Sequence, residues 1–168
     1  MAGKLHWLTE QQLGDTIWDR KTEFFGHNEK EKWFREMKIG RGYVDFARFT
    51  SAAVELFELK ITASIHSVYQ LSKYKSDLEG LVMKTFWFGP EKKIIEGDPE
   101  IMSHLIARFV DNDIVHFCNH IGICLWKIDV ANNGDVNGID LISDDNEKYN
   151  VQDRPLAMEL LNHFAVKQ

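Results

Sequence analysis

Near the start of the chain, hydrophobic residues recur at helical spacing. Leu13 and Ile17 stand one turn apart on a single stripe, and Thr9 and Gln12 form a capping box in front of them. This pattern predicts a helix that begins after Thr9 and runs to about Phe24.

The next segment, residues 28–40, is dense in charged residues. Glu31 and Arg35 are spaced by one helical turn, as in a stabilising ion pair on a helix surface, and Gly40 is suited to end such a helix. We therefore expect a second, short helix here, so that residues 1–40 form a helical N-terminal part.

Two strand-like stretches follow at 42–49 and 54–61, and the loop between them predicts an antiparallel hairpin. The later expected elements are a helix over 64–82, a strand within 81–89, a helix over 98–110 that starts at Asp98 and Pro99, a strand over 121–130, a turn over 132–138 and a helix from Pro155. This order predicts an α/β fold in which helices cover a small sheet. We expect a single domain, with a core over 41–130 and a C-terminal turn and helix over 131–168.

The expected hairpin places charged side chains where the sheet should bury them. In the register that a four-residue loop imposes, Ala47 lies opposite Leu56 and Asp45 lies opposite Glu58. Because side chains alternate along a strand, Asp45 shares a face with Ala47, and Lys60 shares a face with Glu58. Two carboxylates directly opposite each other repel and should destabilise the sheet unless something compensates.

A divalent cation is the compensation that fits these residues. Mg²⁺ takes oxygen ligands and is often held by one or two carboxylates, with water and phosphate in its other positions. Lys60, beside the carboxylates, could orient or help to deprotonate an attacking water. Asp45, Glu58 and Lys60 therefore suit metal-assisted hydrolysis of a phosphodiester. The alternative that the same spacing allows is an ordinary cross-strand ion pair at a solvent edge of the sheet.

The residues around these three resemble the PD-(D/E)xK nuclease superfamily. Residues 42–46 (GYVDF) are similar to its strand with the first acid, and residues 55–61 (ELFELKI) are similar to its E-x-K strand. Gln70 and Tyr74 resemble the Q-x-x-x-Y helix motif of the RecB-like and NucS-like branches. Val44 stands at the position of the motif's proline, which many members also lack. The resemblance implies a restriction-endonuclease-like fold, with an α-β-β-β-α-β core and a mixed sheet flanked by helices.

The same resemblance implies an activity. Members are endonucleases that cut DNA with Mg²⁺ (or Mn²⁺), which here would be held by Asp45 and Glu58, with Lys60 activating water. Gln70 and Glu10, the latter from the first helix, are expected to complete the catalytic set.

Charge is unevenly distributed along the chain, whose net charge is −6. Residues 20–48 hold eight Lys and Arg against five acids, a local charge of +3, whereas residues 129–168 hold eight acids against three bases, a local charge of −5. We therefore expect the phosphate-binding surface in the N-terminal half. Arg41, Lys73 and Tyr74 are the expected DNA contacts, and a homodimer would supply two sites for two strands.

The acidic balance also supports an alternative of another class. A negative net charge is unusual for a protein that binds nucleic acid through a basic surface. The alternative is a non-catalytic, acidic inhibitor or immunity-type protein on a nuclease-like scaffold. Stabilisation of the folded protein by a metal ion would distinguish the two.

Two further patterns suggest other metals. His116, Cys118 and His120 alternate, so on a strand they would share a face suited to zinc, although packing in a core strand is the simpler explanation. Residues 129–140 match a calcium loop only in part, because Ala131 stands at its third position. A glycine-rich hairpin turn explains that segment.

Composition gives the general class. The chain has 168 residues, of which 44% are hydrophobic, as in a globular protein with a real core. The first twelve residues lack the apolar run of a signal peptide, and no stretch is long enough to span a bilayer. We therefore expect a cytoplasmic protein with no membrane partner, in which Cys118 and Cys124 are reduced thiols.

Overall fold

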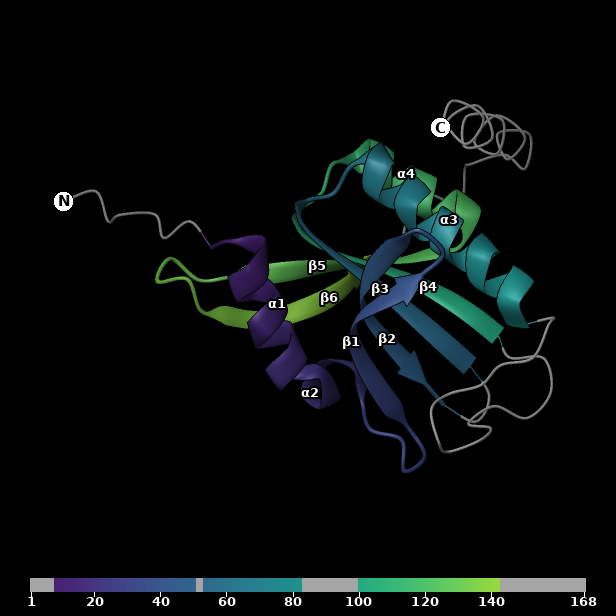
Figure 1. Cartoon of the computed structure of the whole chain (residues 1–168). Helices are drawn as coiled ribbons and strands as arrows, with labels where there is room; N and C mark the ends of the chain where they lie inside the picture. Colours follow the sequence, from purple (N-terminus) through teal and green to yellow (C-terminus); the bar gives the residue numbers. More distant parts are fainter. Residues whose placement is uncertain (1–7, 51–52, 83–99, 143–168) are drawn as a thin grey trace.

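Figure 1 shows the computed structural model, which describes residues 8–50, 53–82 and 100–142. The elements in chain order are α1 (Glu10–Asp19), α2 (Lys21–Phe25), β1 (Lys32–Ile39), β2 (Gly42–Phe49), β3 (Ala53–Thr62), α3 (Ile65–Val82), β4 (Glu100–Phe109), α4 (Asn112–Ile121), β5 (Ile123–Val130) and β6 (Val136–Ile142).

The strands form one six-stranded mixed sheet in the order β1-β2-β3-β4-β5-β6. β1, β2 and β3 are antiparallel neighbours, β3, β4 and β5 run parallel, and β6 returns antiparallel to β5. Parallel neighbours need a crossover connection, and α3 and α4 lie in the two connections concerned. The architecture is α/β, with a mixed sheet flanked by helices, as the sequence predicts.

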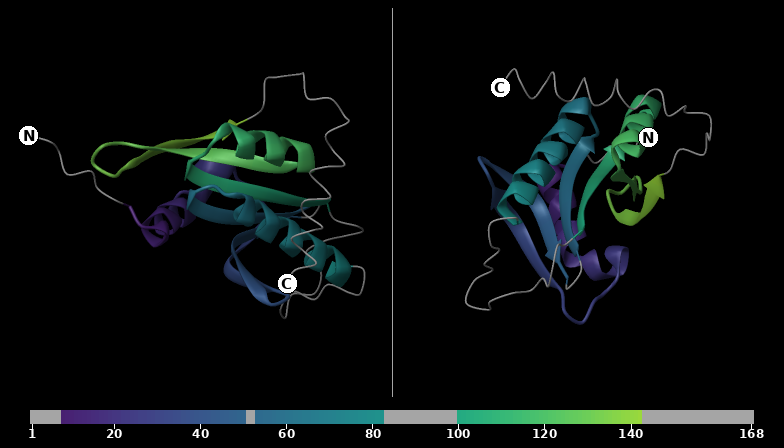
Figure 2. Two further views of the ribbon diagram at one scale, coloured as in Figure 1. Left: turned by 90° about the horizontal axis from the view of Figure 1, so that it is seen from above. Right: turned by 90° about the vertical axis from the view of Figure 1, so that its right-hand side faces the viewer.

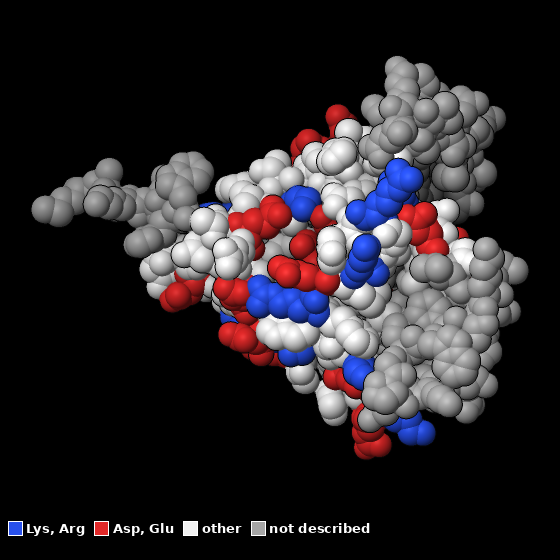
Figure 3. Space-filling view, viewed as in Figure 1, with Lys and Arg blue, Asp and Glu red and all other residues white. Residues whose placement is uncertain are grey.

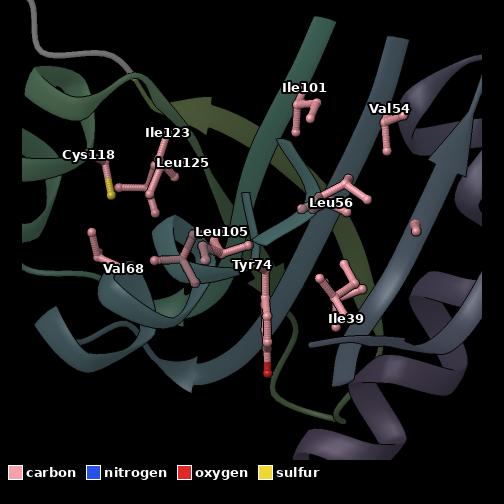
Figure 4. Packing of buried hydrophobic residues seen from close by; sticks show 14 of the residues in the cluster. Ile39, Val54, Leu56, Val68, Tyr74, Ile101, Leu105, Cys118, Ile123 and Leu125 are labelled. Carbon is pink, nitrogen blue, oxygen red and sulfur yellow. The ribbon is translucent and has the colours of Figure 1, made fainter. Parts of the chain in front are cut away.

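Helices cover both faces of the sheet (Figures 1 and 2). α3 and α4 pack on one face around a cluster that includes Leu56, Val68 and Leu105 (Figure 4). α1 packs on the other face around a cluster that includes Leu13 and Phe57. Burying one such side chain stabilises the fold by about 1.5–3 kcal/mol, so these two clusters hold the sheet between its helical layers.

The first helix begins at the predicted capping box. Thr9 Oγ1 accepts a hydrogen bond from the Gln12 backbone N–H at 3.1 Å, and Gln12 Oε1 accepts one from the Thr9 N–H at 2.9 Å. The helix ends earlier than expected, because the backbone leaves the helical conformation at Arg20 (φ −105°, ψ 14°) and separates α1 from α2. β2, β3, α3 and β5 also lie where the sequence predicts them.

The predicted helix over 28–40 is wrong, because most of this segment forms strand β1. Trp33 packs with the cluster under α1 and Phe34 with the cluster under α3, which is the alternation of a strand. Charged residues are common on edge strands, and β1 is an edge of the sheet. Arg35, expected to pair with a glutamate one turn before it, instead pairs with Asp15 of α1.

The predicted helix over 98–110 is also wrong. Its described part is β4, which lies between β3 and β5 and is buried on both faces. Leu105 packs with one cluster and Ile106 with the other, so apolar residues stand at consecutive positions. Such a run fits a buried strand and a helix equally well. Asp98 and Pro99, the expected helix start, lie outside the described residues.

His116, Cys118 and His120, predicted to lie on a strand, belong to helix α4, which is capped by Asp111. His120 Nδ1 lies 3.0 Å from the His116 carbonyl oxygen, one turn earlier. Cys118 is fully buried, and burial raises the pKa of its thiol to about 12. The three side chains therefore do not share the strand face that a zinc site there would need.

The predicted turn over 132–138 is confirmed in part: residues 131–135 form the turn of the β5–β6 hairpin, whereas residues 136–138 belong to β6, a strand that the sequence did not predict. The Ala131 N–H donates to the Asp135 carbonyl oxygen at 2.8 Å, and Asn133 Oδ1 accepts from the Asp135 N–H at 3.1 Å. In both hydrogen bonds, a polar group of the turn binds another polar group of the same turn.

Two predicted elements fall outside the described residues. They are the helix from Pro155 and the strand within 81–89, of which only Leu81 and Val82 are described, as the end of α3. Among the helices of the described part of the chain, none is both long enough and apolar enough to cross a membrane.

Candidate active site

The β2–β3 ladder has the predicted register but ends at the pair of Phe46 and Phe57. Asp45 and Glu58 are therefore not the ladder pair that the sequence predicts. Instead, Asp45 Oδ2 accepts a hydrogen bond from the Leu59 backbone N–H at 2.6 Å. A carboxylate from β2, and not a strand carbonyl, thus binds this amide of β3.

Side chains of β2 change faces at Asp45, just beyond the Phe46–Phe57 end of the ladder. Phe46 belongs to the cluster under α1, whereas Val44 belongs to the cluster under α3. In a regular strand, two residues separated by one position would share a face. The β1 position facing Asp45 in this register is Glu36, the one described non-glycine residue with a positive φ (51°). This irregularity turns Asp45 to the side of α1, and away from the face that it was predicted to share with Ala47.

Glu58, Lys60 and Glu10 form a chain of contacts beside Asp45. The Lys60 ammonium nitrogen lies 2.7 Å from Glu58 Oε1 and 3.3 Å from Glu10 Oε1. Glu58 is only 2% exposed, and its second oxygen, Oε2, is buried without a hydrogen-bond partner. The structure therefore brings together the two acids and the lysine that the sequence singled out, with Glu10 as the acid from the first helix.

Burial dominates the electrostatics of these groups. It raises the pKa of Glu58 to about 7, an effect that the nearby Asp45 charge reinforces and Lys60 opposes. Burial also raises the pKa of Asp45, against the Leu59 hydrogen bond and the Lys60 charge. For Lys60, burial alone would lower the pKa, but the hydrogen bond and charge of Glu58 outweigh it and raise the pKa. Lys60 is thus held as an ammonium ion.

A depression of about 350 Å³ opens at this point, between α1 and the three strands β1, β2 and β3. It is lined by Glu10, Gln11, Gly14, Arg35, Glu36, Asp45, Phe46 and Leu59, and we refer to it as the acidic depression. Three of these lining residues are carboxylates, so the surface attracts cations.

The carboxylates of Asp45 and Glu58 fit a hard cation. A buried carboxylate oxygen without a partner, such as Glu58 Oε2, is unfavourable unless a cation or a donor satisfies it. Within residues 8–50, 53–82 and 100–142, no group of three or more His, Cys, Asp or Glu side chains is arranged to hold a metal ion. Mg²⁺ needs fewer protein ligands than zinc, because water and phosphate complete its shell. The two carboxylates thus suit Mg²⁺ better than zinc.

Gln70 and Tyr74 connect α3 to β2. Gln70 Nε2 donates to the Tyr74 hydroxyl at 2.9 Å, and this hydroxyl donates to the Tyr43 carbonyl oxygen at 2.9 Å. Tyr43 stands two residues before Asp45, so the pair fixes the strand that carries the first acid. Tyr74 is only 5% exposed, and its described contacts are with the protein interior and not with a surface that DNA could reach.

The expected cationic contacts are dispersed. Arg41 and Lys73 are exposed, on the β1–β2 turn and on α3. Arg48 instead lies in a buried network, where it pairs with Glu55 and donates to the Phe25 carbonyl oxygen at 2.9 Å. On the face in Figure 3, acidic and basic side chains are intermingled. The basic side chains on this face therefore form no continuous basic surface there.

No sequence pattern indicated that Arg35 and Glu36 line the acidic depression. Both were assigned to a helix, and their place depends on the pairing of β1 with β2 and on the packing of α1. Arg35 could have been placed on a strand from the sequence only if Trp33 and Phe34 had been assigned to opposite faces of a sheet.

No protein-family model and no curated protein matches this sequence. Solved structures do match its fold. The crystal structure of a repair endonuclease from Pyrococcus abyssi aligns with a TM-score of 0.54 and 18% identity, over 74% of this chain and 48% of that chain. The structure of an EndoMS-dsDNA2 complex aligns with a TM-score of 0.51 and 19% identity, over 74% of this chain and 47% of that chain.

The chain spans about half the length of these two structures. Similarity at this level of identity shows the fold alone: the chain shares the fold of these two structures, one of which is described as a repair endonuclease. The fold implied by the sequence resemblance is confirmed.

Proposed function

We propose that the protein is a metal-dependent nuclease that hydrolyses phosphodiester bonds of DNA. The observation that carries the proposal is the buried Glu58 carboxylate, which gives one oxygen to Lys60 and leaves the other without a partner, beside Asp45 at the end of the β2–β3 ladder. The nuclease-like scaffold and a neighbour described as a DNA complex support the choice of substrate.

Asp45 and Glu58 would hold the cation, Mg²⁺ or Mn²⁺. Bound there, it would supply Lewis-acid polarisation of the scissile phosphodiester and neutralise the charge that develops on it. The protein contributes rigid positioning, since Asp45 is fixed by Leu59 and Glu58 is fixed by Lys60. Gln70 is a positioning residue in this proposal, because it binds Tyr74 and Tyr74 binds the backbone of β2.

Lys60 acts as a hydrogen-bond donor in this proposal. Its raised pKa means that the side chain remains an ammonium ion at neutral pH, so it orients a water or a phosphate oxygen and does not remove a proton. Glu10 is half exposed and contacts Lys60 at the edge of the acidic depression. It would keep the ammonium group directed at the reacting phosphate.

Cleavage of supercoiled, linear, branched and single-stranded DNA with Mg²⁺ or Mn²⁺ tests the proposal. Wild type would be compared with Glu58→Gln and Lys60→Ala, and with Glu79→Gln as a control that removes an exposed carboxylate from α3. We expect metal-dependent cutting by wild type and the control, and a loss of at least about 100-fold in the two site variants.

Thermal unfolding with and without Mg²⁺ gives a second readout. A cation that binds only the folded protein must raise its melting temperature, and Glu58→Gln should abolish that rise. No cutting of any substrate and no metal-induced stabilisation would contradict the proposal and favour the non-catalytic, inhibitor-type protein. Sedimentation with a DNA duplex would show whether two copies act together as a homodimer.

A further inference from the structure

Arg35 is the one cationic residue among those that line the acidic depression. The other charged lining residues are the carboxylates Glu10, Glu36 and Asp45. A phosphodiester approaching three carboxylates would be repelled, and a fixed cation at the same surface reduces that repulsion. The charge of Arg35 therefore has a direct bearing on how an anionic substrate enters.

The guanidinium is held against α1. One of its nitrogens, Nη2, pairs with Asp15 Oδ1, and the two side chains are 36% and 53% exposed. A side-chain carbon built on Gly14 would lie 3.8 Å from the same nitrogen, which shows how closely α1 approaches. Arg35 is also directly opposite Phe46 in the β1–β2 ladder, so its backbone is fixed next to Asp45.

The pair with Asp15 leaves the guanidinium with donors to spare. Arginine carries five N–H donors in a planar fork, and the Asp15 contact occupies one of its nitrogens. Arginine binds phosphate through two parallel hydrogen bonds, which fix orientation as well as affinity. An arginine that is tethered by one nitrogen and faces a depression can present the others to a phosphate.

We infer that Arg35 binds a phosphate group of the DNA backbone at the acidic depression, and that Asp15 is the residue that positions Arg35. This inference rests on the proposed function, since it concerns the same site and its substrate. It assigns the phosphate contact to Arg35, a residue of the basic stretch 20–48, and not to Arg41, Lys73 or Tyr74, the single contacts that the sequence suggested.

The test uses steady-state cleavage by the full chain together with duplex binding in EDTA, measured by fluorescence anisotropy at several salt concentrations. For Arg35→Ala we expect KM and Kd to rise about tenfold or more, with a smaller change in kcat. The slope of log Kd against log salt should fall by about 1, the signature of one lost phosphate contact. Arg35→Lys should keep the slope and recover only part of the affinity.

Two further variants separate the positioning of Arg35 by Asp15 from the general effect of removing an exposed charge. Asp15→Asn should raise KM in the wild-type background and have no effect in an Arg35→Ala background, because it acts through Arg35. Arg20→Ala is the control, since Arg20 forms a similarly exposed pair with Glu23, away from the depression, and its further bond is to the Val136 carbonyl oxygen. It should leave KM and the salt slope unchanged.

The outcomes distinguish this inference from the proposed function. Metal-dependent cutting by wild type, with KM and salt slope unchanged in Arg35→Ala, would overturn the inference and leave the nuclease proposal intact. Absence of cutting by wild type would overturn both.

Discussion

Asp45 on β2 accepts a hydrogen bond from the backbone N–H of Leu59 on β3, just beyond the last pair of the β2–β3 ladder. Leu59 stands between Glu58 and Lys60, so this single bond fixes the first acid relative to both other members of the candidate site. The carboxylate thus has two separable roles, as an acceptor that holds the strands and as a negative charge for a cation.

Two substitutions of Asp45 should separate these roles. Asp45→Asn keeps an oxygen acceptor for the Leu59 amide, so we expect the free energy of unfolding to change by less than about 1 kcal/mol. Asp45→Ala leaves that amide without its partner and should cost about 1–3 kcal/mol. Urea denaturation measures both. Equal stability of the two variants would show that the hydrogen bond contributes nothing, whereas stabilisation by Mg²⁺ should be lost in each.

The pKa of Glu58 predicts a pH dependence for the metal-free protein. Its pKa is raised from 4.5 to about 7 in the folded state, so its contribution to stability is fully present below pH 4.5 and is lost as the pH rises through 7. The loss amounts to about 3 kcal/mol. The pKa values of His104 and Asp45 are also raised, so both residues add to the loss of stability as the pH rises.

Glu58→Gln isolates the glutamate's share of this effect. We expect wild type in EDTA to lose more stability between pH 5 and pH 8 than the variant does, as measured by urea denaturation. Parallel pH profiles for the two proteins would mean that Glu58 titrates at its ordinary pKa and that its burial has no such consequence.

How far the sequence predicted this structure depends on where each residue's partners lie. The capping box of Thr9 and Gln12 and the register around Ala47 are set by neighbours a few residues away, and both were predicted correctly. β1 and β4 were mistaken for helices, because a charged edge strand and a strand buried on both faces lack the simple alternation of a half-exposed strand.

The candidate site shows the same division. Asp45, Glu58 and Lys60 follow from strand spacing, and the structure brings them together as expected. The change of face at Asp45 lies opposite the left-handed backbone of Glu36 on β1, which no local pattern indicates. The Arg35 pair joins residues 20 positions apart, on elements that the sequence did not place against each other.

A buried ionic network away from the candidate site should be important for stability. Glu55 is 8% exposed, pairs with Arg48, and lies 3.2 Å from His104 Nε2 through its other oxygen. Burial alone would raise the Glu55 pKa, but the nearby His104 and the hydrogen bond from Arg48 outweigh it and hold the pKa at about 2.

Glu55→Ala should therefore cost about 3 kcal/mol, since it leaves the buried Arg48 charge with Glu31, at 3.6 Å, in place of its nearer partner. Calorimetry or urea denaturation measures this loss. The control is Glu23→Ala, which breaks an exposed pair with Arg20 and should change stability little. Similar effects of the two substitutions would contradict a special role for the buried network.

Gly42 and Tyr74 supply the last prediction, a clash between a side chain at position 42 and the Tyr74 ring, whose hydroxyl oxygen is the nearest atom. A side-chain carbon built on Gly42 would lie 2.5 Å from the Tyr74 hydroxyl oxygen and 2.7 Å from ring carbon Cε1, and Tyr74 is buried and held by Tyr43. Gly42→Ala should thus destabilise the protein by about 1–3 kcal/mol. Tyr74→Phe alone should cost about 1 kcal/mol. Combined, the two should cost less than their sum, because the phenylalanine lacks the nearest clashing atom. Additive costs in this double-mutant cycle would show that the hydroxyl does not limit the approach of β2 to α3.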